Sequence, residues 1–366
     1  MARDPEVGQA VHACPLSCLG SAPWFSVGGL AGEHRLGHAD GGARLMRPIL
    51  RRAQSLAALL AILLLAAITS PVASDGSRIF LEIGNLTDIL RQISLIGMIS
   101  LAMTFVILTG GIDLSVGSTL ALSTALTAMG LTRLWPTASY GSHIALAIAM
   151  AVALSTLAGA LNGVAIATLR VQPFIVTLAS MIGLRGLAKW LTDNENIDIG
   201  FGRDVAARFA ELFREKAIVI GAFAGAAAGF WILLDHTVFG RHVRAIGDNE
   251  KSAEYTGLPI RRTKVWVYSL TGLLAGIAGV LYAAENHQGN PNAGVAYELD
   301  AIAAVVIGGT RLSGGKGSIS GTIVGTLIMG VLTNMLRLNN VDSNVEMMIK
   351  AVIIVLAVAV QRETNR

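Results

Sequence analysis

The stretch VILTGGIDLSVGSTLAL, residues 106–122, places one carboxylate, Asp113, in an apolar segment beside the pair Gly110 and Gly111. A glycine pair in such a run is typical of a helix that breaks, because glycine permits backbone conformations that other residues avoid. Backbone groups freed by a break at membrane depth need partners in the protein or in a water-filled cavity. We therefore predict a broken helix at Gly110, Gly111 and Gly117.

Two roles are open for the polar side chains at this break. Asp113 and Ser115 can cap the helix that follows, where a negative charge also faces the positive end of the helix dipole. Alternatively, Asp113 faces a translocation path, since ionisable groups inside membranes are rare and usually functional. Both residues are therefore candidates for the path.

The composition identifies a membrane protein. Of the 366 residues, 53% are apolar and only 14% are charged, whereas globular domains carry about a quarter charged residues. Several apolar runs approach or exceed the ~20 residues that cross ~30 Å of hydrocarbon as a helix. We predict an all-α, polytopic bundle with broken helices and about ten spans, at residues 54–73, 93–109, 113–131, 143–168, 172–191, 217–235, 265–284, 297–309, 317–337 and 346–361.

Lys and Arg in the short loops predict the orientation. Arg44, Arg47, Arg51 and Arg52 precede the first span, and the loop 240–264 carries six basic residues against three acids. The loop 192–216 carries six acids against four bases and falls on the other side. Ten crossings then place both termini, including the tail 362–366, in the cytoplasm. The net charge of +4 reflects this cytoplasmic face rather than nucleic-acid binding, because no aromatic residues interleave the basic ones.

Residues 1–45 differ from the rest of the chain. They are rich in Gly and His and lack periodicity, and a basic start followed by an apolar run begins at Met46. We predict that residues 1–45 are disordered, or are an upstream extension that the cell does not make. The first span is predicted to be an uncleaved helix, with a cleavable signal as the alternative. Cys14 and Cys18 are too few for a disulfide framework or a zinc site, and we find no metal or catalytic cluster.

A second glycine cluster resembles the first. The segment GGTRLSGG, residues 308–315, shares five of eight residues with GGIDLSVG, residues 110–117. The similarity is either a parallel internal repeat or a coincidence in a glycine-rich chain. The spacing around Lys316 and the glycine after it exclude a phosphate-binding loop. We predict a second helix break, formed by Gly308, Gly309, Gly314 and Gly315.

The stretch VQPFIVTLASMIGLRGLAKWL, residues 171–191, contains another interruption. Pro173 predicts a helix that begins near Gln172, because proline suits the first turn of a helix. Gln172, Phe174 and Asn162 can offer a sugar amide hydrogen bonds and a ring face. Helix packing explains Gln172 and Phe174 equally well, and it is the favoured explanation for Asn162 alone. Arg185 needs a partner at membrane depth, and the sequence does not identify one.

The stretch GRHVRAIGDNEKSAEYTGLPIRRTK, residues 240–264, is the longest cytoplasmic loop. Its segment NEKSAEYTGL has helical composition and ends at Gly257, with Pro259 just beyond. A short charged helix of this kind can dock into a groove on a soluble partner. A solvated basic loop near anionic lipid is the alternative.

Four stretches together resemble successive signatures of one family: LTGGIDLSVGS, PFIVTLASMIGLRGLA, GRHVRAIGDNEKSAEYTGL and YELDAIAAVVIGGTRLSGGKGSISGT. The family is the permease subunit of bacterial ATP-binding-cassette importers for monosaccharides, of the ribose, xylose and galactose type. The resemblance covers residues 46–361. It implies a multi-pass permease domain in the bacterial inner membrane that forms the sugar path and is not itself an enzyme.

The resemblance also implies partners. These are cytoplasmic subunits that bind ATP and Mg²⁺, a second permease copy or a sister permease, and a periplasmic or lipid-anchored sugar-binding protein. An ion-coupled secondary sugar transporter is the alternative, and Asp113 is the feature in its favour. Asp248 departs from the family's coupling motif, where a small or neutral residue is common. The motif itself maps onto Ala245, Gly247, Asn249, Glu250, Ala253 and Gly257.

Overall fold

The computed structural model of the chain divides by its contacts into two units, Met1–Arg47 and Pro48–Arg366. The structure describes residues 56–73, 76–134, 140–200 and 204–363. The predictions for residues 1–45, including those for Cys14 and Cys18, lie outside the described residues. So does most of the predicted cytoplasmic tail.

Most of the described chain is helical, as predicted. An apolar helix, Leu56–Thr69, comes first, and a two-residue antiparallel pairing joins β1 to β2. The labelled elements in chain order are η1 (Ile79–Leu81), α2 (Ile83–Leu108), α3 (Val116–Thr132), α4 (Tyr140–Leu169), α5 (Pro173–Leu191), β1 (Ile197–Asp198), α6 (Val205–Phe213), α7 (Lys216–Asp235), α8 (Val238–Asp248), α9 (Glu250–Tyr255), α10 (Ile260–Asn286), β2 (Gln288–Gly289), α11 (Tyr297–Ile307), α12 (Ile319–Leu338) and α13 (Ser343–Glu363).

The helices have the lengths of membrane-spanning segments. Among the described residues, six helices are long and apolar enough to cross a membrane: α2, α4, α5, α7, α10 and α12. Each of the ten predicted apolar stretches contains a helix, but α11 has only 11 residues. At 1.5 Å per residue this is about 16 Å, roughly half the hydrocarbon thickness. The chain is therefore a polytopic helical membrane protein in which α11 is a half-length helix.

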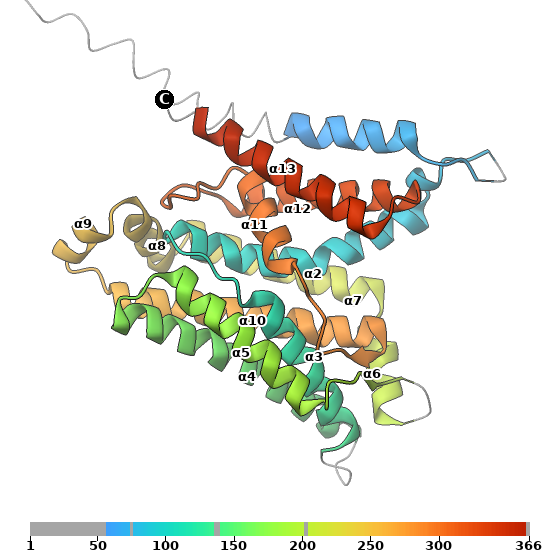
Figure 1. Cartoon of the computed structure of the whole chain (residues 1–366), viewed down its shortest axis with the longest axis horizontal. Coiled ribbons are helices and arrows are strands. Elements are labelled where there is room, and N and C mark those ends of the chain that lie inside the picture. The colour runs from blue at the N-terminus through green and yellow to red at the C-terminus, as the bar shows by residue number, and fades with distance from the viewer. Residues whose placement is uncertain (1–55, 74–75, 135–139, 201–203, 364–366) are drawn as a thin grey trace, which may run out of the picture. The chain divides into compact units, whose positions relative to one another are not determined.

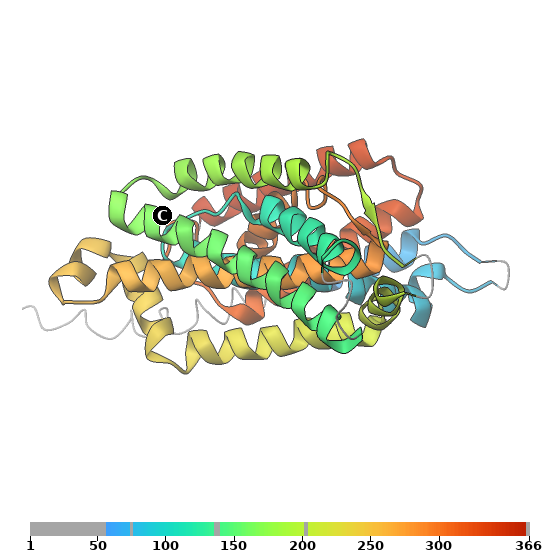
Figure 2. The ribbon, with the colours of Figure 1, turned by 90° about the horizontal axis from the view of Figure 1, so that it is seen from below.

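Two helices, α2 and α10, lie at the centre of the bundle. Of the most apolar 18-residue stretch in each helix, 78% is buried in α2 and in α10, against 11% in α5 and 17% in α7. Figure 2 shows α5 and α7 at opposite edges, with α10 between them. Small residues let α4 and α10 approach closely: a Cβ at Gly159 would overlap the carbonyl oxygen of Tyr268, and one at Gly272 would overlap that of Ser155. Such contacts are typical of helix pairs in membranes.

The local signals in the sequence place several helix ends. Helix α5 begins at Pro173, with Gln172 as its N-cap residue, as predicted. The predicted helix in the loop 240–264 is α9, which is followed by Gly257 at φ +77°. The side chain of Asn249 caps α9 by accepting the backbone N–H of Ser252 at 3.0 Å. Helix α8, which precedes α9 in the same loop, was not predicted.

Helices α8 and α9 lie together at one end of the bundle (Figure 1). They connect the C-terminal end of α7 to the N-terminal end of α10, and α8 also contacts α2. One face of α8 is apolar and buried, through Val243 and Ile246, while its other face carries Arg241 in solvent. The loop 240–264 is therefore largely helical, with α8 packed against the bundle and most of α9 exposed.

Candidate functional site

The first predicted break is present between α2 and α3, at residues 109–115. Gly110 has φ +76°, and the N–H groups of Gly110 and Gly111 donate to the carbonyls of Ile107 and Val106 at 2.9 and 3.0 Å. This left-handed glycine ends α2 because it costs a glycine little to adopt that conformation. Gly117 lies outside the break, as the second residue of α3.

Asp113 is buried inside this break, with 2% of its surface exposed. Its Oδ1 accepts the backbone N–H of Ser115 at 2.9 Å and the Ser115 hydroxyl at 2.6 Å. Two hydrogen bonds to one oxygen hold the carboxylate against the start of α3. The predicted role of Asp113 in fixing the start of a helix is consistent with this geometry.

Ser115 behaves differently from its prediction. It occupies the N-cap position of α3, but its side chain makes no cap hydrogen bond. Its hydroxyl donates to Asp113 instead and accepts from Nδ2 of Asn162 in α4 at 3.0 Å. Asp113, Ser115 and Asn162 therefore form one buried polar chain that joins the break to α4.

Tyr268 in α10 belongs to the same cluster, although the sequence analysis missed it. Its side chain is buried, and its hydroxyl has no hydrogen-bond partner among the described residues. A Cβ at Gly111 would lie 2.5 Å from that hydroxyl oxygen, and Asp113 is close enough to interact with it electrostatically. Tyr268 stands in an uninterrupted apolar run, so nothing in its spacing marked it.

The other two predicted path residues do not join this cluster. Gln172 and Phe174 are exposed at the start of α5. The link between α5 and the break is Thr177 instead, whose hydroxyl donates to the carbonyl of Ile112 at 3.2 Å. The role of Gln172 and Phe174 in sugar contact remains a prediction.

An irregular segment, residues 287–296, runs along α3 before α11 begins. Near its start, a Cβ added at Gly289 would crowd Ala128. Near its end, a Cβ added at Gly294 would lie 2.9 Å from the carbonyl oxygen of Gly117. Gly117 is therefore a glycine because backbone approaches it closely, not because the helix breaks there. Gly289, Pro291, Ala293 and Gly294 are buried against protein, which satisfies irregular backbone at membrane depth, while Asn292 and Val295 are exposed.

Arg185 has its partners in this irregular segment. Its guanidinium donates to the carbonyl of Pro291 at 3.0 Å and to that of Ala293. Thr124 supports the same segment, because its hydroxyl donates to the carbonyl of Asn290 at 2.9 Å. The charged side chain of Arg185 inside a span is thus explained, because it donates to backbone carbonyls that have no helical partner.

The second predicted break lies between α11 and α12. Helix α11 ends as α2 does: the N–H groups of Gly309 and Thr310 donate to the carbonyls of Val306 and Val305 at 2.8 and 3.1 Å. Gly309 has φ +90°, and Gly314 and Gly315 are also left-handed. The two glycine segments touch, since the N–H of Gly315 donates to the carbonyl of Leu108 at 3.0 Å.

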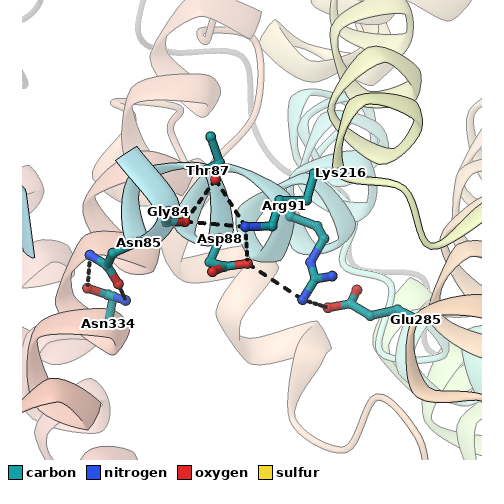
Figure 3. Close-up of polar contacts among 8 residues, drawn as sticks. All are labelled: Gly84, Asn85, Thr87, Asp88, Arg91, Lys216, Glu285 and Asn334. Carbon is teal, nitrogen blue, oxygen red and sulfur yellow. Dashed lines mark hydrogen bonds and ion pairs between the residues drawn. The ribbon is translucent and has the colours of Figure 1, made fainter. Parts of the chain in front are cut away.

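A polar cluster joins four helices (Figure 3). The cluster lies at the opposite end of the bundle from α8 and α9. Asp88 in α2 pairs with Lys216 in α7 at 2.8 Å, and Arg91 in α2 pairs with Glu285 in α10 at 3.2 Å. Beside them, the amides of Asn334 in α12 and Asn85 in α2 bond to each other at 2.8 Å. The sequence analysis did not identify this cluster, because its members are far apart along the chain.

A second charged network ties α11 to α12 and α13. Lys350 pairs with Asp300 at 3.2 Å and with Glu346 at 2.9 Å, and Arg337 pairs with Glu346 at 3.3 Å. The side chains of Lys350, Asp300 and Glu346 are only 13%, 14% and 6% exposed. This network compensates the charge of Asp300 in the first turn of the half-length helix α11.

Broken helices, a buried polar chain at a break and an irregular segment inside the bundle are together typical of membrane transport proteins. The comparisons define the class further. The chain belongs to the permease family described as the branched-chain amino acid transport system permease component, whose model matches residues 85–358.

Among curated relatives, the chain is 42% identical to the ribose import permease protein RbsC of Escherichia coli K12 over 316 residues, which cover 83% of this chain and 92% of that one. It is 42% identical to RbsC of Bacillus subtilis over 78% of this chain and 87% of that one. The fructose import permease protein FrcC of Rhizobium meliloti is 32% identical, over 83% and 84%. No solved structure matches significantly. The resemblance drawn from the four signatures is thereby confirmed.

The geometry of Asp113 leads to a prediction about its charge. In Asp113→Asn the amide oxygen can still accept both hydrogen bonds from Ser115, so we expect membrane abundance to change little. Sugar uptake is expected to fall several-fold, because asparagine lacks the negative charge of aspartate although the two side chains are similar in size. Asp113→Leu removes both bonds and is expected to lower stability by about 1–3 kcal/mol. Uptake and thermal unfolding of both variants test this, and normal uptake by Asp113→Asn would show that only the acceptor matters.

Proposed function

We propose that this chain is the membrane-spanning permease subunit of an ATP-binding-cassette importer and forms the translocation path for a monosaccharide. One observation carries the proposal: 42% identity to a ribose import permease over 83% of the chain. Other relatives are named for arabinose, fructose and xylose. The chain is accordingly a multi-pass protein of the bacterial inner membrane.

Ten crossings with both termini in the cytoplasm are the topology we propose. The end of α2, the end of α7 and the start of α10 contact or flank α8 and α9, so these ends lie on one side. The basic loop 240–264 assigns that side to the cytoplasm. The eighth crossing consists of the irregular segment 287–296 and α11 together.

In this proposal, partner subunits supply the energy for transport. Separate cytoplasmic subunits bind ATP and Mg²⁺ and hydrolyse the nucleotide. A second permease copy, or a sister permease, completes the path, and a periplasmic or lipid-anchored sugar-binding protein delivers the sugar. ATP binding shifts the permease between outward-open and inward-open states only through a difference in affinity for them.

Helix α9 is the part of the chain that we assign to the ATP-binding subunit. Asn249, Glu250 and Gly257 of the mapped motif are exposed there, and Tyr255 is 88% exposed. Glu250 already pairs with Lys264 at 2.6 Å. A Glu250→Lys change would therefore disturb the loop as well as the docking surface.

Tyr255 provides a cleaner test of docking. We expect Tyr255→Ala to reduce co-purification of the ATP-binding subunit at least five-fold at unchanged membrane abundance, because aromatic side chains are frequent anchors of interfaces. Leu212→Ala, an exposed position in α6 at the other end of the bundle, is the control. Equal co-purification by the two variants would contradict docking at α9.

Reconstitution tests the proposed function as a whole. The chain is purified with the proposed ATP-binding subunit and sugar-binding protein, and is placed in liposomes. Labelled D-ribose, L-arabinose, D-xylose and D-fructose are offered one at a time, with and without ATP. We expect uptake of at least one sugar that requires ATP and both partners. Uptake by the chain alone, driven by a proton or sodium gradient, would instead establish ion coupling.

A further inference from the structure

The C-terminal end of α8 lies in direct backbone contact with both helix breaks. A Cβ at Gly247 would overlap the carbonyl oxygen of Leu108, the last residue of α2, and would lie 2.5 Å from the backbone nitrogen of Gly315. The same carbonyl of Leu108 accepts the N–H of Gly315 at 3.0 Å. Three segments far apart in the sequence therefore meet at one point.

The contact is equally close from the other side. A Cβ at Gly314 would lie 2.9 Å from the carbonyl oxygen of Gly247 and 3.1 Å from the backbone nitrogen of Gly110. A Cβ at Gly315 would overlap the carboxylate of Asp248. No side chain larger than hydrogen fits between these three backbones, so a displacement of one must be taken up by the others.

A second contact holds α8 to α2 nearby. The ring of Phe239 stacks on that of Phe105 with centroids 6.0 Å apart, and Phe230 of α7 meets Phe105 edge-on at 5.3 Å. Phe105 is buried in the last turn of α2. Helix α8 is thus attached to the end of α2 at two points along its length.

We propose that Gly247 is a positioning residue that transmits movement of α8 and α9 to both helix breaks at once. The inference rests on the proposed function, in which α9 receives the force. Gly247 then acts inside the permease and not at the ATP-binding subunit. The movement passes over a short distance. Gly247 contacts Leu108 at the end of α2, and the backbone turns two residues later at Gly110. Asp113 lies three residues beyond Gly110.

The test separates transmission from docking and from folding. Gly247→Ala adds one methyl group at the junction, and Gly225→Ala adds the same group on α7, where a Cβ meets nothing within 4 Å. Both variants are assembled with the ATP-binding subunit and the sugar-binding protein in liposomes. Uptake of the labelled sugars, co-purification of the ATP-binding subunit, and stimulation of ATP hydrolysis by sugar-loaded binding protein are measured for each.

We expect Gly247→Ala to retain co-purification and to lose at least ten-fold in uptake, with ATP hydrolysis no longer stimulated by the loaded binding protein. Gly225→Ala is expected to match the wild type in all three. Normal uptake by Gly247→Ala, or loss of co-purification in step with uptake, would overturn the inference. Absence of ATP-dependent uptake by the wild type would overturn the proposed function itself.

Hydrogen exchange on the unmodified assembly covers the case in which Gly247→Ala does not fold. Exchange is compared with and without a non-hydrolysable ATP analogue. We expect amide exchange to change in residues 108–116 and 308–318 together. Unchanged exchange in both segments, while the ATP-binding subunit closes, would refute transmission through Gly247.

Discussion

Lys350→Met is expected to lower the free energy of unfolding by about 3–5 kcal/mol, since removal of one partner leaves buried charges uncompensated. Lys350 pairs with Asp300, and it also pairs with Glu346. Without it, Asp300 loses this ion pair in α11, while Glu346 in α13 keeps its pair with Arg337. Thermal unfolding in detergent and abundance in the membrane measure the loss.

A matched pair of variants controls this prediction. Lys251→Met removes the same charge from an exposed position in α9 and is expected to leave the unfolding temperature unchanged. Lys350→Met combined with Asp300→Asn and Glu346→Gln removes the opposing charges too, and is expected to recover much of the stability. A triple variant no more stable than Lys350→Met alone would show that packing, not charge, explains the effect.

Arg185→Met is expected to release the irregular segment 287–296 from α5. The carbonyls of Pro291 and Ala293 lose their donor, and each unpaired buried carbonyl costs about 1–3 kcal/mol. Sugar uptake is expected to fall more than ten-fold, because this segment positions the half-length helix α11. Limited proteolysis within residues 287–296 measures the release of the segment. A separate assay of uptake in liposomes measures the loss of transport.

Conservative and distant replacements define what Arg185 contributes. Arg185→Lys keeps the charge but lacks the planar fork that donates to two carbonyls, so we expect an intermediate result. Lys189→Met, one turn further along α5, removes a charge whose side chain makes no hydrogen bond within the part of the chain that the structure describes, and this variant should resemble the wild type. If Arg185→Met and Lys189→Met are equally resistant to proteolysis, the guanidinium does not hold the segment.

The helix boundaries were predictable where one residue type dictates the local backbone. Pro173 begins α5 because proline suits a first turn, Gly110 ends α2, and Gly257 follows α9. Gly117 was assigned wrongly to a break. The sequence pattern could indicate that position 117 needs a small residue. The reason for that need is the close approach of the backbone of Gly294, which lies far along the chain.

The candidate site was only partly predictable. Asp113, Ser115 and Asn162 were named from their types and do meet. Tyr268 was missed because a tyrosine in an apolar span carries no local signal. Gln172 and Phe174 were chosen for their chemistry, yet the rotation of α5 about its axis leaves them exposed.

The amino-acid sequence by itself determined the class of this protein: apolar runs long enough to cross a membrane, interrupted at glycine and proline, with four family signatures in order. Such features depend on each residue and its near neighbours, so they can be read locally. Only the tertiary structure decided which groups satisfy each other, as Arg185 does for the carbonyls of Pro291 and Ala293, and where Gly247 touches two helix ends. Those partners are set by the packing of helices, which joins groups that no spacing along the chain relates.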